Sequence, residues 1–392
     1  MRIMKKRKPA VYPQLVCWEL KKLWQMRAFR GFLLCGLILN LLLVSASRQE
    51  LSYTAYVREA GEAAGTRMGP AFDKKAAQLA DSQEKQQFIS ETSGARDIFQ
   101  EYSCQGAAQD YICAYKITGW LADSLWQKYK KQEPQIQRLA AQQASMDLGA
   151  AGMTKPLFEL LFEKLCRAIL TEGLFLAVFA ALYVCGCARA DGTWQTVYAS
   201  RRGRLVQREK FLAGLLYALA AYAVTAAVSC TAFACTWRLG GIWNTNMSTQ
   251  FYYIQAMGIR LPFVPWTSFT LKSYLAAVLA LGTAVVLLFY AAGYLAGLLC
   301  TNSYGGFLVL FLAGALNFLI VLLAGNSMRW GIYEAAMWTP FLLWWQQPQW
   351  FSDMGINAIV PWQECRTAGV CMGASVILLY AGFWYFARKD LK

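Results

Sequence analysis

Six long apolar segments restrict what this chain can fold into. Each is close to the roughly 20 residues that an α-helix needs to cross a bilayer, and 57% of the 392 residues are hydrophobic. A soluble domain of this size rarely carries so much apolar surface. The sequence therefore predicts an all-α integral membrane protein with six transmembrane helices. The predicted spans are residues 31–47, 165–188, 211–237, 275–300, 307–324 and 368–387.

Positive charge is concentrated in three segments, and this predicts the orientation of the spans. Residues 1–30, 189–210 and 388–392 together carry a net charge of +14, out of a total of +15. Because Lys and Arg are enriched in cytoplasmic loops, we expect both termini and the 189–210 loop on the cytoplasmic side of the plasma membrane. This role of positive charge in setting the orientation explains the excess of basic residues. Nucleic acid is therefore not expected as a partner.

The first 30 residues are expected to form a basic tail followed by an amphipathic helix. Apolar residues recur at helical spacing between positions 16 and 24, whereas Glu19 and the lysines face elsewhere. Such a helix suits the inner membrane–water interface. The alternative is a cytoplasmic extension of the first span. The residues assigned to the interfacial helix are Trp18, Lys21, Lys22 and Trp24.

A polar insertion, residues 48–164, separates the first two spans. It holds 15 of the 23 acidic residues and is rich in Ala, Gln, Lys and Glu, which favour helix. We expect a folded extracellular domain of helical hairpins, with breaks at Gly61–Gly69–Pro70, at Gly94 and at Glu133–Pro134. Cys104 and Cys113 form a possible disulfide if the compartment is oxidising. The pair requires a turn between them, because residues nine apart on one helix do not meet.

The remaining loops are short or aromatic. Residues 238–274 and 325–367 contain few charges and many aromatic residues, which predicts short helices at the outer membrane–water interface. Anchoring in the interface is the simpler interpretation, and direct substrate contact is the alternative. Residues 301–306 form a cytoplasmic turn so short that the fourth and fifth spans must be antiparallel neighbours.

The residues that the sequence lacks exclude several kinds of chemistry. Without His there is no His-ligated zinc and no Ser-His-Asp triad. Without G-x-x-x-x-G-K-[ST] the usual cradle for ATP phosphates is missing. We therefore expect no catalytic, cofactor-binding or metal-binding residues in this chain. Gly293 and Gly297 form a G-x-x-x-G pair, which indicates close packing of two spans.

Glu172 is the only acidic residue inside a predicted span. An intramembrane carboxylate is a candidate functional group by default, so Glu172 is a possible polar site for transport. Alternatively, it pairs with Arg167 or Lys164, or it reaches the lipid headgroups. Spans with so few other charges do not favour a secondary carrier or an ion channel.

Two stretches resemble a known family of membrane proteins. The runs WELKKLWQMRAFRGFLL (18–34) and DGTWQTVYASRRGRLVQREKF (191–211) are similar to permease subunits of bacterial ATP-binding-cassette type-2 exporters. Members of that family have an amphipathic connecting helix and then six spans. Between spans two and three they carry an acid, Gly and Thr, then apolar positions, a basic cluster and a Lys. Asp191 stands where the family more usually has Glu. The large insertion departs from compact members, although a subset of bacterial permeases carries such domains.

The resemblance implies that the 189–210 loop is a coupling helix seated in a cleft of a separate cytoplasmic ATPase. ATP and Mg²⁺ then bind to that partner, and this chain pairs with a second permease to move a lipid-like, peptide or drug-like substrate. The aromatic and apolar side chains of the loop are expected to form an outward docking knob. The arginines are expected to pair with acids of the ATPase or with anionic headgroups. The residues assigned to coupling are Asp191, Gly192, Thr193, Trp194, Val197, Tyr198, Arg201 and Arg204.

Two other classes of protein fit the same sequence. A non-transporting membrane sensor, immunity or scaffold protein, with an extracellular domain that binds a peptide, would purify without an ATPase. A secondary carrier would transport in ATP-depleted vesicles, driven by an ion gradient.

Overall fold

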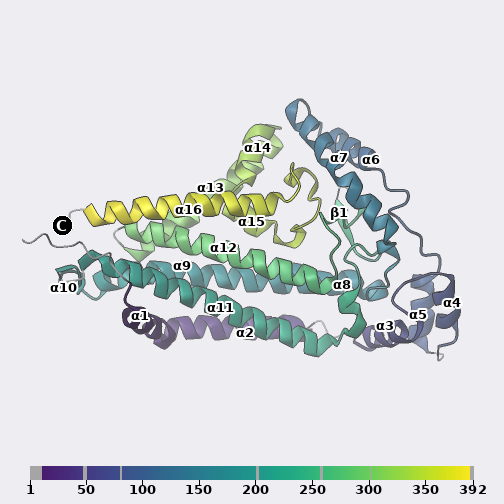
Figure 1. The fold of residues 1–392 in the computed structure, drawn as a ribbon, viewed down its shortest axis with the longest axis horizontal. Helices are drawn as coiled ribbons and strands as arrows, with labels where there is room; N and C mark the ends of the chain where they lie inside the picture. Colours follow the sequence, from purple (N-terminus) through teal and green to yellow (C-terminus); the bar gives the residue numbers. More distant parts are fainter. Residues whose placement is uncertain are drawn as a thin grey trace, which may run out of the picture.

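Long helices that run along one axis make up most of the chain (Figure 1). The insertion lies at one end of this bundle, and α10 (Trp194–Ala199) lies at the other, beside the last turns of α16 (Gln363–Arg388). We call these the insertion end and the α10 end. The computed structural model describes residues 11–46, 51–79, 82–199, 203–256, 259–300 and 302–388.

Six helices in the described part of the chain are long and apolar enough to cross a membrane. Their number and order agree with the predicted spans. Each extends beyond its predicted apolar segment at one or both ends, because backbone hydrogen bonding continues into the polar residues that flank the apolar core. The six are α2 (Arg27–Ala46), α9 (Arg167–Ala190), α11 (Val206–Trp237), α12 (Leu271–Leu299), α13 (Ser303–Asn326) and α16 (Gln363–Arg388).

Helix α9 lies at the centre of the bundle. Most of its residues are buried, and it packs against α2, α11, α12 and α13. A Cβ atom added to Gly293 of α12 would lie 3.1 Å from the Cβ of Ala181. One added to Gly297 would lie 2.8 Å from the Cβ of Cys185. The G-x-x-x-G pair therefore lets α12 approach α9 closely, as its sequence indicates.

The outer helices leave many apolar side chains exposed. Helix α13 buries only three small residues, Gly306, Gly314 and Ala324, and α2 and α16 also expose apolar side chains. Leaving one large apolar side chain in water costs about 1.5–3 kcal/mol, so a surface of this kind fits a lipid environment. The architecture is compatible with an all-α membrane protein. The large exposed hydrophobic side chains of α13 are Tyr304, Leu308, Val309, Phe311, Leu312, Leu316, Leu319, Leu322 and Leu323.

Helix α1 (Pro13–Gln25) is a separate helix at the α10 end. The chain leaves the helical conformation at Met26, whose ψ is 126°, and α2 begins at the next residue. Helix α1 packs against α11, where the Trp24 ring lies 5.0 Å from that of Tyr217. It is therefore not a continuous extension of the first span.

One charged residue of α1 departs from the predicted pattern. The periodicity places Glu19 on the polar face, but its side chain lies on the buried face, only 8% exposed. Lys22 lies 3.8 Å from its carboxylate and offsets part of this charge. The Lys22 ammonium also lies 3.8 Å from the ring centre of Trp18, which is 57% exposed. Helix α1 thus presents an aromatic ring and basic side chains away from the bundle.

The insertion folds into helices around two small apolar cores. One core contains Phe72 and Phe88, and the other contains Leu121, Leu125 and, from a later loop, Val264. The elements are α3 (Leu51–Ala64), α4 (Pro70–Ala77), α5 (Gln83–Thr92), α6 (Cys104–Ala114), α7 (Trp120–Ala141), η2 (Ala144–Met146), η3 (Ala151–Met153), α8 (Thr154–Phe158) and the π-helical η4 (Glu159–Cys166), which leads into α9.

The chain breaks at two of the three predicted positions in the insertion. Helix α3 ends at Ala64 and α4 begins at Pro70, so the break predicted around Gly69 and Pro70 is present. Gly94, with φ of +78°, follows the end of α5 as expected. Helix α7, however, continues through Pro134, although proline usually ends or kinks a helix. Tyr129 and Ile136, on either side of the proline, are buried in the same core. This packing holds the helix together, and the predicted break at Pro134 is wrong.

The two aromatic loops fold differently from each other. Within residues 238–274, β1 (Tyr253–Ala256) and β2 (Ile259–Pro262) form an antiparallel hairpin, so the prediction of short helices is wrong for this part. Apolar and polar side chains alternate there, which favours strand. Residues 325–367 contain short helices, as expected. The helical segments of the two loops are η6 (Gly240–Asn244), α14 (Trp330–Met337), α15 (Pro340–Trp345), η7 (Gln347–Gln349) and η8 (Gly355–Asn357).

A buried lysine joins the insertion to the segment that precedes α16. The Lys128 ammonium on α7 donates to the carbonyl oxygens of Asp353, Gly355 and Ala358 at 2.9, 2.7 and 2.9 Å. It also lies 2.5 Å from the Asp353 carboxylate, which accepts a hydrogen bond from Tyr129 at 2.7 Å. Burial lowers the pKa of Lys128, and the charge of Asp353 opposes that shift. These contacts offset the desolvation of the ammonium.

Lys128→Ala should release the insertion from this segment. The change leaves the largely buried Asp353 carboxylate without its cationic partner, which destabilises a fold by about 3–5 kcal/mol. We expect a lower melting temperature and faster amide exchange in residues 353–358. Lys130→Ala, which removes an exposed lysine of the same helix, should change neither quantity. Equal effects of the two variants would contradict the anchoring role.

Candidate functional site

A tight turn places α10 outside the bundle (Figure 1). Gly192 adopts a φ of +67°, a left-handed conformation that glycine takes without strain. The Thr193 amide then donates to the carbonyl of Ala188 at 2.9 Å. None of the six residues of α10 is buried, and Asp191 beside it is exposed. The predicted coupling loop is therefore a short surface helix between α9 and α11.

Tyr198 points from α10 towards the bundle. Its ring lies 5.6 Å from that of Phe386 near the end of α16, and its hydroxyl accepts a hydrogen bond from Gln207 at 2.7 Å. Trp194 and Val197 are half-buried and lie outside the apolar core against which Tyr198 packs. The prediction of a three-residue outward knob is corrected in one respect, because Tyr198 contacts a span and does not face outward.

Two arginines of this region bind the ends of other spans. Arg204 donates to the carbonyl oxygens of Phe386 and Ala387 at 3.0 and 2.7 Å. Arg189 donates to the carbonyl of Cys300, which caps α12, at 3.0 Å. Cations at these positions satisfy the free carbonyls of a helix C-terminus and interact favourably with its dipole. Arg204 thus has partners within the chain, whereas Arg201 lies outside the described residues.

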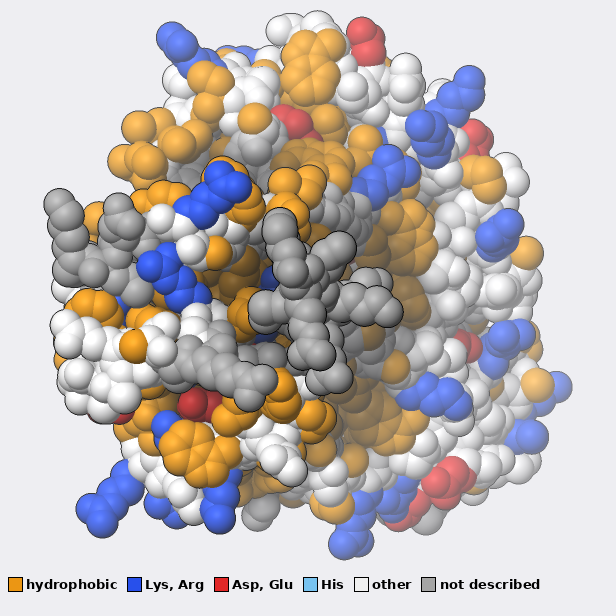
Figure 2. All heavy atoms as spheres, turned by 60° about the vertical axis from the view of Figure 1, so that its left-hand side comes forward, with side chains coloured by type: hydrophobic (Ala, Val, Ile, Leu, Met, Phe, Trp, Pro, Cys, Tyr) orange, Lys and Arg blue, Asp and Glu red, His pale blue; other side chains and the backbone are white. Residues whose placement is uncertain are grey.

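The surface around α10 is basic. Figure 2 shows this face, where Lys and Arg side chains lie among hydrophobic ones and acidic side chains are few. The predicted interfacial residues of α1 contribute here, with Trp18 and Lys21 exposed and Lys22 and Trp24 half-buried. Other exposed basic residues of α2, α11 and α16 are Arg27, Arg30, Arg208 and Arg388.

Glu172 belongs to a polar cluster inside the bundle. The Asn40 amide, which is fully buried, donates both to the Glu172 carboxylate at 2.9 Å and to the Ser229 hydroxyl at 3.1 Å. The cluster therefore joins α2, α9 and α11. Arg167 is not its partner, because that guanidinium donates to the carbonyl of Trp345 at 2.6 Å. Sequence reasoning missed Asn40, which is polar but carries no charge.

The possible disulfide in the insertion is not formed. Cys104 and Cys113 are both free, and both lie on α6. Nine residues of helix separate their Cα atoms by about 13 Å, whereas a disulfide requires less than about 7 Å. The turn that the pairing needs is absent. Within the described ranges, no group of three or more Cys, Asp or Glu side chains is placed to hold a metal ion.

Comparison with known protein families, with curated proteins and with solved structures finds no match to this chain. The functional assignment therefore rests on its own residues. Three residues that make contacts in and beside α10 were not predicted from the sequence. They are Gln207, Phe386 and Arg189. The partners of Phe386 and Arg189 are distant in the sequence, and no local pattern pairs Gln207 with Tyr198, nine residues before it.

Arg204→Gln should loosen the last turn of α16. The variant loses two charge-assisted hydrogen bonds to its carbonyls, and for this half-buried group we expect a loss of roughly 1 kcal/mol. Amide exchange measured by mass spectrometry should become several-fold faster in α10 and in residues 383–388. Arg208→Gln, at an exposed arginine of α11, is the matched control. Unchanged exchange in Arg204→Gln would argue against the link.

Proposed function

We propose that this chain is the permease subunit of an ATP-driven exporter of the ATP-binding-cassette type-2 class in the plasma membrane. The observation that carries the proposal is the position of α10. It has no buried residue, yet side chains in and beside it contact the ends of three spans. Tyr198 and Arg204 contact α16, and Arg189 donates to the carbonyl that caps α12. The Thr193 amide donates to the carbonyl of Ala188 in α9.

In this proposal α10 docks on a separate cytoplasmic ATPase, to which ATP and Mg²⁺ bind. Trp194 and Val197 form the docking surface, and the basic residues around them hold this end inside the cell and attract acidic groups. When ATP binding moves the ATPase, a displacement of α10 reaches α16 and α12 through the contacts of Tyr198, Arg204 and Arg189. This chain itself makes no covalent chemistry.

Helix α1 supports the same arrangement. It lies at the α10 end, packs against α11, and presents Trp18 and Lys21 away from the bundle. We propose that it lies in the inner membrane–water interface, where an aromatic ring and lysines are both stable. A second permease, identical or homologous, completes the transporter, and a lipid-like, peptide or drug-like substrate moves between the two.

A photo-crosslinking amino acid in place of Trp194 tests the docking. In native membranes we expect an ultraviolet-dependent adduct with a protein that mass spectrometry identifies as a P-loop ATPase, and ATP should change its yield. Trp194→Ala should lower the yield of ATPase that purifies with the chain by about tenfold or more, as truncation of a central aromatic contact does.

The matched control places the same crosslinker at Tyr198, which contacts Phe386 within the chain. There we expect internal crosslinks to α16 and little ATPase adduct. Adducts at position 194 with lipid alone would contradict the proposal. So would ATPase adducts of equal yield at both positions, or transport that persists in ATP-depleted vesicles.

A further inference from the structure

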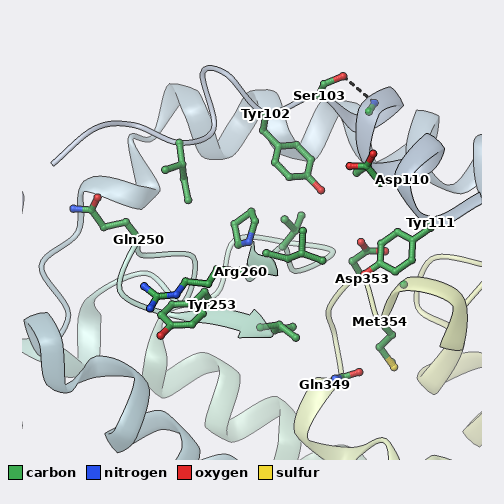
Figure 3. Close-up of a pocket in the computed structure, with 18 of the residues that line it drawn as sticks. Tyr102, Ser103, Asp110, Tyr111, Gln250, Tyr253, Arg260, Gln349, Asp353 and Met354 are labelled. Atoms are coloured by element: carbon green, nitrogen blue, oxygen red, sulfur yellow. Dashed lines mark hydrogen bonds between the residues drawn. The ribbon is translucent and has the colours of Figure 1, made fainter. Parts of the chain in front are cut away.

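A cavity of about 950 Å³ opens at the insertion end, far from α10. Four parts of the sequence form its walls: α6 with residues 98–103 before it, residues 152–156, the β1–β2 hairpin with the residues beside it, and residues 349–357 (Figure 3). The volume lies near the upper limit of about 300–1,000 Å³ that is usual for ligand pockets. None of its lining residues belongs to the proposed ATPase site, so its occupancy does not depend on that partner.

One side of the cavity is cationic. The guanidinium of Arg260 lies 4.7 Å from the ring centre of Tyr253, and the ammonium of Lys155 lies 3.9 Å from it. Lys155 is also 3.6 Å from the Glu159 carboxylate, whereas Arg260 forms no ion pair with a described residue. A guanidinium held against an aromatic face keeps its forked donors free for a carboxylate.

The other side is acidic. Asp110 on α6 and Asp353 lie across the cavity from Arg260 and Tyr253 (Figure 3). The Asp353 carboxylate is already occupied by the Lys128 ammonium and the Tyr129 hydroxyl. Asp110 is exposed and forms no ion pair within the described chain. Glu101 also lines the cavity and is exposed. Asp110 is the free carboxylate that lies across the cavity from Arg260 in Figure 3, so we take it as the group that accepts a cation from a ligand.

Between the charged sides the wall is aromatic, apolar and amide-bearing. Tyr102 and Tyr111 contribute aromatic rings, Ile254 and Leu261 offer apolar contacts, and Gln349 offers a side-chain amide. Side-chain amides can pair with the N–H and C=O groups of a peptide backbone. A small ion or a purely apolar ligand would leave most of these groups unused.

We propose that this cavity binds short peptides that carry a positive charge at one end and a free carboxylate at the other. The carboxylate lies at Arg260 and Lys155, and the cationic end lies at Asp110. Because both signs of charge are present on opposite sides, the order of charges in the ligand matters more than its net charge.

The test uses the purified full chain and equilibrium dialysis against tetrapeptide pools, with the bound fraction read by mass spectrometry. The first pool has Lys at position one, three variable positions and a free carboxylate, and the second is its C-terminal amide. A third pool has acetylated Gln at position one. We expect saturable binding of the first pool, with Kd below about 1 mM, and binding weaker by about tenfold for each of the others.

Two variants connect each charge with its side of the cavity. Arg260→Gln should weaken binding of the free-carboxylate pool about tenfold and leave the amide pool unchanged. Asp110→Asn should weaken the Lys pool and leave the acetylated Gln pool unchanged. Arg96→Gln and Asp123→Asn, at exposed residues outside the cavity, are the matched controls. Thermal unfolding of each variant shows whether it folds.

Several outcomes would overturn the proposal. The first is that none of the pools binds. The second is that all three pools bind equally well, so that neither the carboxylate nor the amine matters. The third is that Arg260→Gln and Arg96→Gln lose the same binding affinity. Binding of phosphoethanolamine without any peptide binding would overturn it as well, in favour of a lipid headgroup site. If a variant does not fold, the comparison of the three pools on the unaltered chain still tests whether the cavity binds such peptides.

Discussion

Close packing of α9 against its neighbours determines the arrangement of the other helices. Apolar helices gain no hydrophobic free energy from each other inside a bilayer, so their association relies on van der Waals contact and hydrogen bonds. Glycines provide the contact: a Cβ atom on Gly173 of α9 would lie 2.7 Å from the Tyr222 ring of α11. Asn40 provides hydrogen bonds to both α9 and α11. The outer helices attach to this centre and keep most of their surface exposed.

Helix α10 has one side that packs against the bundle and one side that is exposed. Trp194 and Tyr198 are one helical turn apart, but only Tyr198 packs against the core. Its ring contacts Phe386, and Arg204 binds the carbonyls of the same turn of α16. A partner bound to the exposed part of α10 would therefore act on α16 without direct contact with it.

The elements that follow from local pattern could be predicted from the sequence, and those that depend on distant contacts could not. Long apolar segments predict six helices because the backbone in a membrane must satisfy its own hydrogen bonds. Gly94 marks a break because it adopts positive φ. By contrast, Pro134 lies inside α7 because tertiary packing outweighs its local cost. Asn40, the partner of Glu172, is 132 residues away, and the contact of Tyr198 with Phe386 links segments that are still further apart in the sequence.

The anchor at Lys128 has a mechanical consequence for α16. The anchored residues Asp353, Gly355 and Ala358 lie shortly before the start of α16, and the Ile359 amide donates to the Gln363 side chain in its first turn. The opposite end of the helix receives Arg204 and Tyr198. An α-helix of 26 residues, about 39 Å long, resists compression along its axis. Both ends of α16 are therefore fixed to other parts of the chain, and α16 is a second rigid connection between the insertion and α10, beside the continuous helix of residues 151–190.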